Sequence, residues 1–175
     1  MIRNLMLIDD NDLDQTLCAR LIKRSGLVGE LHGFLMAEEA LSFLEQRNAP
    51  QIDAILLDIN MPRMDGFEFL RTANKQLGEK FRDIPVFMLS TSESGADRLQ
   101  AQDHDMVCGY FGKPLDTARL RTVADVVATN ANQCGPRGQG DENHRRSCFF
   151  GRSQDRRFAN RRSSLGMRAR NAFRQ

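Results

Sequence analysis

Residues 56–66 read LLDINMPRMDG, and this stretch decides the prediction of the fold. Its first two residues belong to an apolar run over 54–57, and an acid, Asp58, follows this run. Pro62 and Gly66 then mark a turn. A short apolar run bounded by turn residues is typical of a strand buried on both faces of a parallel sheet. Because such sheets gather their ligands at the carboxyl ends of the strands, Asp58 is the first candidate site residue.

Short apolar runs alternate with helix-like stretches along residues 1–132. Apolar runs predict strands over 5–8, 30–34, 54–57, 86–89 and 108–111. Apolar residues at helical spacing, such as Leu13, Leu17 and Leu21, predict five helices. These helices are expected near 13–21 and over 37–46, 66–77, 95–104 and 116–129. Alternating strands and helices predict an α/β fold, a doubly wound five-stranded parallel sheet flanked by five helices.

Charge divides the chain near Asn132. Residues 1–132 contain 14 Lys and Arg against 20 Asp and Glu, a net charge of −6. Residues 133–175 contain 11 Arg, no Lys and 3 acids, a net charge of +8, and lack sustained apolar periodicity. Such a segment buries too little apolar surface to offset chain entropy. We therefore expect a folded domain over 1–132 and a disordered, Arg-rich tail over 133–175.

Composition excludes several other classes of protein. No apolar run approaches the roughly 20 residues of a membrane span, and the N-terminus is too acidic for a secretory signal. The four cysteines lack the short paired spacing of zinc or redox sites, so free thiols are expected. We expect a soluble, cytoplasmic protein without a membrane partner.

Further polar groups join Asp58 if the five strands lie parallel in one sheet. Asp9 and Asp10 follow the first strand. Ser90 ends the fourth strand, and Lys113 follows the fifth. Because the carboxyl ends of parallel strands share one edge, three carboxylates, a hydroxyl and an ammonium are expected to converge there.

Carboxylates that lie this close raise one another's pKa unless a cation neutralises them. Mg²⁺ suits the three acids because it prefers oxygen ligands, whereas the His and Cys ligands of a zinc site are missing from this cluster. With Mg²⁺ in place, one oxygen of Asp58 could attack a phosphoryl group. The ammonium of Lys113 and the hydroxyl of Ser90 would then stabilise the transferring oxygens.

Four motifs, in this order and spacing, resemble the receiver domain of two-component response regulators, the CheY-like family. The motifs are LIDDND at 7–12, LLDINMPRMDGFEFL at 56–70, IPVFMLSTS at 84–92 and GYFGKPLD at 109–116. The resemblance covers residues 3–130. It implies the flavodoxin-like fold of that family and a role in phosphorelay signal transduction.

The resemblance also implies a role for each acid. Asp58 would be the phosphoacceptor that becomes an aspartyl phosphate. Asp9 and Asp10 would orient Mg²⁺, and the backbone carbonyl of Asn60 would be a further ligand of the ion. Taken alone, Asp9 and Asp10 could instead cap the first helix, since acids are common at that position.

Three residues near the fourth and fifth strands complete the implied switch. Ser90 would be the switch hydroxyl, Lys113 the partner of the phosphoryl group, and Tyr110 the aromatic residue that rotates inward. Tyr110 could instead be a packing residue on an edge strand. In the family the bond between this lysine and the next proline is usually cis, which would apply to Lys113–Pro114.

The implied function is that of a signalling domain rather than an enzyme. A histidine kinase or histidine phosphotransfer protein would supply the phosphoryl group. Phosphorylation would change the face formed by 95–104, 108–111 and 116–129. Since no second folded domain is expected after the first, output would pass to a protein partner through this face, with a homodimer as one form of it.

Two other functions stay open. The arginines of 133–175, interleaved with Phe149, Phe150, Phe158 and Phe173, could bind nucleic acid as an output. An aspartate-nucleophile phosphohydrolase of the haloacid dehalogenase type would also place an acid after a strand. That family requires a second aspartate two residues later, where this chain has Asn60.

Overall fold

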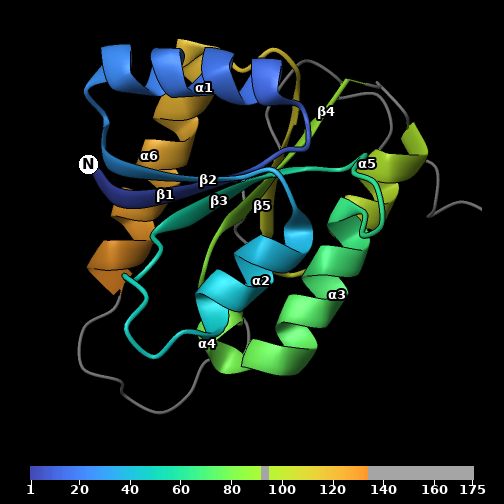
Figure 1. Cartoon of the computed structure of the whole chain (residues 1–175). Helices are drawn as coiled ribbons and strands as arrows, with labels where there is room; N and C mark the ends of the chain where they lie inside the picture. Colours follow the sequence, from blue (N-terminus) through green and yellow to red (C-terminus); the bar gives the residue numbers. More distant parts are fainter. Residues whose placement is uncertain (92–94, 134–175) are drawn as a thin grey trace, which may run out of the picture.

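The computed structural model describes residues 1–91 and 95–133, and within them five parallel strands form a single sheet (Figure 1). The spatial order of the strands is β2-β1-β3-β4-β5, and every neighbouring pair is parallel. The strands are β1 Ile2–Ile8, β2 Val28–Phe34, β3 Ala54–Asp58, β4 Val86–Ser90 and β5 Val107–Gly112. The prediction of an α/β fold with a five-stranded parallel sheet is therefore confirmed.

Within the described part of the chain six helices flank the sheet, where the sequence predicted five. They are α1 Asp12–Ser25, α2 Ala37–Glu45, α3 Gly66–Leu77, α4 Glu79–Arg82, α5 Gly95–Gln102 and α6 Thr117–Gln133. The additional helix, α4, has four residues and buries only Phe81. A single turn cannot show the apolar recurrence on which the prediction rested. Among the described residues, no helix is both long enough and apolar enough to cross a membrane.

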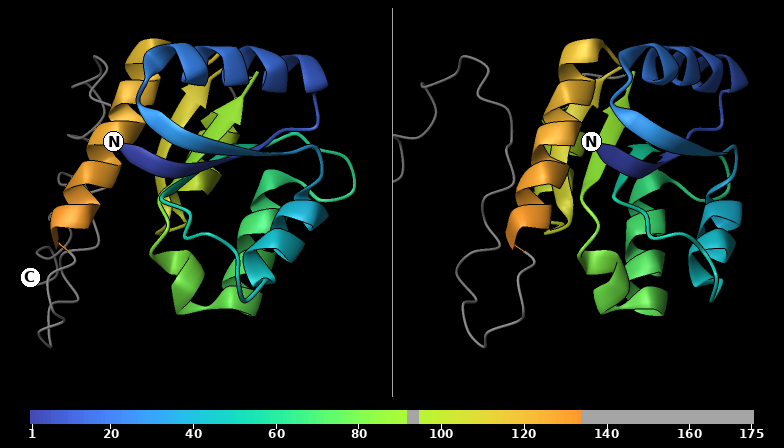
Figure 2. Two further views of the ribbon diagram at one scale, coloured as in Figure 1. Left: turned by 60° about the vertical axis from the view of Figure 1, so that its left-hand side comes forward. Right: turned by 90° about the vertical axis from the view of Figure 1, so that its left-hand side faces the viewer.

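The helices cover both faces of the sheet (Figures 1 and 2). On one face α1 and α6 pack over a core that includes Leu5, Leu56 and Leu120. On the other face α2, α3, α4 and α5 pack over a second core that includes Met6 and Ile55. Successive residues of one strand thus serve different cores, which is why the strands are apolar on both faces.

The buried face of α1 differs from the one that its leucines indicate. Leu13 and Leu17 are 65% and 46% exposed, whereas Cys18 and Ile22 are buried. The fourfold spacing of leucines correctly predicts a helix, but Cys18 and Ile22 have the same spacing one residue later. Periodicity alone does not decide which of two adjacent apolar rows faces the sheet.

The order of the strands determines where side chains can gather. The chain passes from β1 to β2 on one side and then to β3 on the other, so β1 lies between them. In a doubly wound sheet, this reversal opens a crevice at the carboxyl ends of the strands. Asp58 is the last residue of β3, and Asp9 directly follows β1. Both acids therefore lie at the strand ends where the order reverses.

The predicted tail, residues 133–175, lies outside the described residues except for Gln133, which is the last residue of α6. The domain boundary near Asn132 remains an expectation.

Gly66 allows α3 to begin directly against the end of β3. Its N–H donates to the carbonyl of Ile59 at 2.9 Å. A Cβ atom at Gly66 would lie 2.5 Å from the backbone oxygen of Asp58. Asp65 and Glu68 form a capping box that fixes the start of the helix. The close approach of these two backbones thus requires glycine at position 66.

We predict that Gly66→Ala destabilises the protein by about 1–3 kcal/mol, the usual cost of forcing an added methyl group into a packed site. Chemical denaturation followed by circular dichroism measures this loss. Gly95→Ala is the matched control, because an added Cβ at Gly95 meets nothing within 4 Å at the start of α5. If the two variants are equally stable, the close approach at Gly66 is not a constraint.

Candidate functional site

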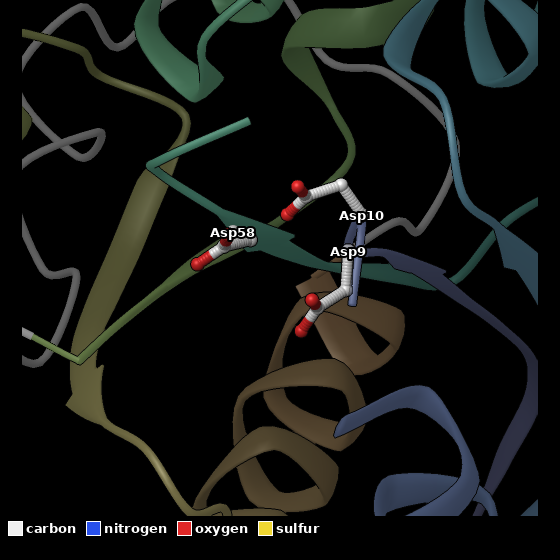
Figure 3. A group of neighbouring side chains, drawn as sticks. All are labelled: Asp9, Asp10 and Asp58. Atoms are coloured by element: carbon white, nitrogen blue, oxygen red, sulfur yellow. The ribbon is translucent and has the colours of Figure 1, made fainter. Parts of the chain in front are cut away.

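Three carboxylates from two strand ends form the centre of the site (Figure 3). Asp9 and Asp10 follow β1, and Asp58 ends β3. One oxygen from each of the three residues lies within 4.8 Å of the others. Asp9 and Asp58 are buried, whereas Asp10 is exposed. The expected convergence of the three acids is therefore present.

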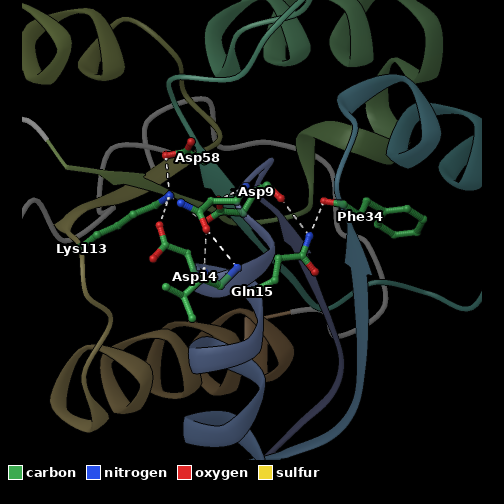
Figure 4. A network of polar contacts seen from close by, with 8 residues as sticks. Asp9, Asp14, Gln15, Phe34, Asp58 and Lys113 are labelled. Atoms are coloured by element: carbon green, nitrogen blue, oxygen red, sulfur yellow. Dashed lines mark hydrogen bonds and ion pairs between the residues drawn. The ribbon is translucent and has the colours of Figure 1, made fainter.

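Lys113 extends from the end of β5 into this cluster (Figure 4). Its Nζ lies 2.7 Å from Asp9 Oδ2 and 3.1 Å from Asp58 Oδ1. A third carboxylate, Asp14 of α1, accepts a hydrogen bond from the same Nζ at 3.2 Å. The side chain of Lys113 is only 9% exposed. The sequence prediction paired Lys113 with the site but did not include Asp14.

Backbone hydrogen bonds fix the position of Asp9. Its Oδ1 accepts from the N–H of Asn11 at 3.0 Å, and its own N–H donates to the carbonyl of Phe34 at 3.1 Å. Gln15 Nε2 donates to the carbonyls of both Asp9 and Phe34, at 3.0 and 2.6 Å (Figure 4). Gln15 thus joins the ends of β1 and β2, a role that the sequence analysis also missed.

The start of α1 explains how Asn11 and Asp14 reach the site. Asn11 is the N-cap, and its side chain accepts hydrogen bonds from the backbone N–H groups of Leu13 and Asp14. Asn at this position satisfies donors that have no partner within the helix. Asn11, rather than Asp9 or Asp10, thus caps α1, and those two acids are available for the site. A search for acids in the first turn after the aspartate pair could have found Asp14.

Burial makes this crowding of negative charge unfavourable. Burial raises the pKa of Asp58 above its usual value, and the negative charge of Asp9 raises it further, although Lys113 opposes the rise. Burial also raises the pKa of Asp9. For Lys113, burial alone would lower the pKa, but the interactions with Asp9 and Asp58 outweigh it and raise the pKa. One ammonium therefore offsets the carboxylate charge only in part.

The cluster fits a hard divalent cation such as Mg²⁺. Its donors are carboxylate oxygens from Asp9, Asp10 and Asp58, the ligand type that Mg²⁺ prefers. Asp9 Oδ2 is buried and has no hydrogen-bond partner among the described residues, although it forms an ion pair with Lys113 Nζ at 2.7 Å. A buried carboxylate oxygen in this state has acceptor capacity left for an ion. Asn60 is exposed in the loop after β3, and its carbonyl remains a predicted ligand.

Ser90 lies on β4, the neighbour of β3, and Tyr110 lies on β5, the edge strand beyond β4. Ser90 ends β4 and is buried, and its carbonyl accepts the N–H of Lys113 at 2.7 Å. Tyr110 on β5 is partly buried against the core, and the guanidinium carbon of Arg98 lies 6.0 Å from its ring centroid. The peptide bond between Lys113 and Pro114 is cis, as predicted. The switch roles of Ser90 and Tyr110 stay predictions.

Comparison with known proteins identifies similar chains. The family model described as the response regulator receiver domain matches residues 5–125. A probable methanogenesis regulatory protein, FilR2, from Methanothrix harundinacea is 32% identical over 128 residues, which cover 70% of this chain and 79% of that protein. The sensor histidine kinase CheAY from Helicobacter pylori is 32% identical over 118 residues, which cover 66% of this chain but only 14% of that protein.

A similar fold occurs among solved structures. A two-component response regulator from Cytophaga hutchinsonii superposes with a TM-score of 0.68 at 28% identity. The superposition covers 73% of this chain and 98% of that chain. The likeness therefore extends across almost the whole of that response regulator chain.

We predict that without divalent cations Asp58→Asn is more stable than the wild-type protein at pH 7. Because the pKa of Asp58 lies above its value of 3.8 in the unfolded chain, its protonation stabilises the fold fully below pH 3.8. This contribution is lost as the pH rises through the raised pKa. The difference in the free energy of unfolding between variant and wild type should therefore be small at low pH and grow toward pH 7. Unfolding in the presence of a chelator measures this difference.

Adding Mg²⁺ should then stabilise the wild-type protein, by about 2.7 kcal/mol at a hundred times its dissociation constant. The Asp58→Asn variant should gain less because it has lost a ligand. Asp83 is an exposed acid that precedes β4 at the opposite edge of the sheet, so the Asp83→Asn variant should behave as the wild type. An Asp58→Asn variant less stable than wild type in the chelator at pH 7 contradicts this account.

Proposed function

The chain belongs to the response regulator receiver domain family of two-component signalling, and we propose that Asp58 is its phosphoacceptor. Receiver domains pair with histidine kinases, so the donor would be a phosphohistidine of a kinase or of a histidine phosphotransfer protein. The observation that carries the proposal is the position of Asp58. It is buried at the end of β3, it contacts Lys113 at 3.1 Å, and it lies within 4.8 Å of Asp9 and Asp10.

In the proposed reaction an oxygen of Asp58 attacks the phosphorus atom of the donor. The bond from phosphorus to the histidine nitrogen breaks, and the imidazole leaves with its electron pair. An acyl phosphate then remains on Asp58. Catalysis of this step consists mainly of positioning and electrostatic stabilisation of the transferring oxygens.

Residues around Asp58 would each support this step. Asp9 and Asp10, together with the carbonyl of Asn60, would hold Mg²⁺. The bound ion would supply positive charge next to the phosphoryl oxygens. Lys113 would exchange its contact with the Asp58 carboxylate for one with a phosphoryl oxygen. The hydroxyl of Ser90, on the neighbouring strand end, would donate to another.

The proposed output surface is formed by α5, β5 and α6, which correspond to the face predicted over 95–104, 108–111 and 116–129. Movement of Ser90 toward the phosphoryl group would leave space for Tyr110 to rotate inward. The contact between Arg98 and Tyr110 would then change. Leu99 of α5 is 66% exposed on the same helix as Arg98, which would favour a protein partner or a second copy of this chain.

The two alternative functions receive no comparable support. A phosphohydrolase requires a general acid two residues after the nucleophile, and Asn60 cannot supply a proton in that way. The proposed nucleic-acid output depends on residues 134–175, which lie outside the described residues. The receiver role without classical enzymatic turnover therefore remains the proposal.

We predict that acetyl phosphate with Mg²⁺ adds one phosphoryl group to the wild-type protein. Intact-mass spectrometry measures the gain, which should be stable in acid and labile in base because it is an acyl phosphate. Asp58→Asn should not be labelled, since it lacks the nucleophile. Chelation of Mg²⁺ should prevent labelling of the wild type.

Asp83→Asn is the matched control, because it makes the same chemical change at the opposite edge of the sheet. It should be labelled at the rate of the wild type. Equal labelling of Asp58→Asn and wild type, at whatever rate, would remove Asp58 from its proposed role.

A further inference from the structure

Asp14 occupies a position that the proposed reaction does not use. It lies in the first turn of α1, and its Oδ2 accepts a hydrogen bond from Lys113 Nζ at 3.2 Å. The same ammonium contacts Asp9 and Asp58 (Figure 4). An ammonium has three N–H donors, and here it meets three carboxylates. A phosphoryl oxygen that takes the place of Asp58 at Lys113 must therefore compete with the carboxylates that remain, Asp9 and Asp14.

The position of Asp14 is set by the fold. Its backbone N–H donates to the Asn11 side chain at 3.2 Å, and the N–H of Asn11 donates to Asp9 Oδ1 at 3.0 Å. A chain of hydrogen bonds thus connects Asp14 to a proposed metal ligand. The side chain of Asp14 is 29% exposed and that of Lys113 is 9% exposed. Partial burial weakens the screening of this pair by solvent.

The charge of Asp14 also extends into the surrounding structure. Burial raises the pKa of the Cys18 thiol to about 11, and the charges of Asp9 and Asp14 contribute to the rise. Cys18 lies one helical turn after Asp14 on the buried side of α1. A group that acts on a buried thiol in this way also acts on an anion that enters the site.

We propose that Asp14 is a positioning residue that competes with the incoming phosphoryl group for Lys113 and thereby slows phosphorylation of Asp58 by anionic donors. This inference rests on the proposed phosphoacceptor role of Asp58. Asp14 keeps one donor of Lys113 occupied and adds a fourth carboxylate to Asp9, Asp10 and Asp58. Both effects oppose the entry of an anionic phosphodonor, and the added negative charge also favours the binding of a cation. Loss of the Asp14 charge therefore changes anion transfer and cation binding in opposite directions.

The test compares Asp14→Asn and Asp14→Ala with Asp12→Asn in the full chain. Asp12 is in the same first turn of α1 and is exposed, so its variant removes the same charge away from Lys113. Initial rates of labelling by acetyl phosphate are measured at saturating Mg²⁺ for each variant. Calorimetric titration measures Mg²⁺ affinity without a phosphodonor.

Both neutral variants of Asp14 should be labelled about fivefold faster than wild type, the effect of one partly screened charge pair. Their Mg²⁺ dissociation constants should rise about two- to threefold by the same electrostatic argument. Asp14→Glu, which keeps the charge, should return both quantities toward wild type. Asp12→Asn should match wild type in both. A variant that only damaged the fold would lose labelling and Mg²⁺ binding together.

Two results separate this inference from the function on which it rests. Wild-type protein that labels at Asp58, with Asp14→Asn and Asp14→Ala labelling at the wild-type rate or more slowly, overturns the role of Asp14 alone. Wild-type protein that fails to label, or labels elsewhere than Asp58, overturns the proposed function and this inference together.

Discussion

A buried ammonium holds carboxylates from three separate elements at one edge of the sheet. Lys113, after β5, contacts Asp9 after β1, Asp14 in α1 and Asp58 at the end of β3. These acids repel one another, and burial increases the cost of the charges of Asp9 and Asp58. One positive charge cannot neutralise these carboxylates. The site therefore suits a further cation, and an anion that enters changes its charge balance. Both properties are required of a phosphoryl acceptor.

The fold makes this arrangement possible because the charges lie at strand ends and the apolar residues lie inside. In β1, β3 and β4 almost every side chain is buried, so the sheet is packed on both faces up to the end of β3, where Asp58 lies. Gly66 lets α3 begin against the backbone of Asp58. Asn11 starts α1 and leaves the acids before it available. The apolar core and the charged site thus occupy different positions along each strand.

Much of this could be predicted from the sequence, because strands buried on both faces are continuous apolar runs and parallel strands end at one edge. The acids at 9, 10 and 58 and Lys113 follow from that rule. Its failures have physical causes. The four-residue α4 has too few positions for periodicity, and the leucines of α1 do not reveal which adjacent row faces the core. Asp14 and Gln15 act through side-chain geometry, which strand ends do not predict.

The central claim is that Asp9, Asp10 and Asp58 bind one divalent cation beside the phosphoacceptor. Paramagnetic Mn²⁺ added below stoichiometry to isotope-labelled protein tests it, because Mn²⁺ broadens NMR signals only near its binding site. The account predicts that broadening is strongest for the amides around these three aspartates and that excess Mg²⁺ reverses it. Broadening centred on another part of the chain, or equal broadening in a protein that lacks the Asp9 and Asp58 carboxylates, would contradict it.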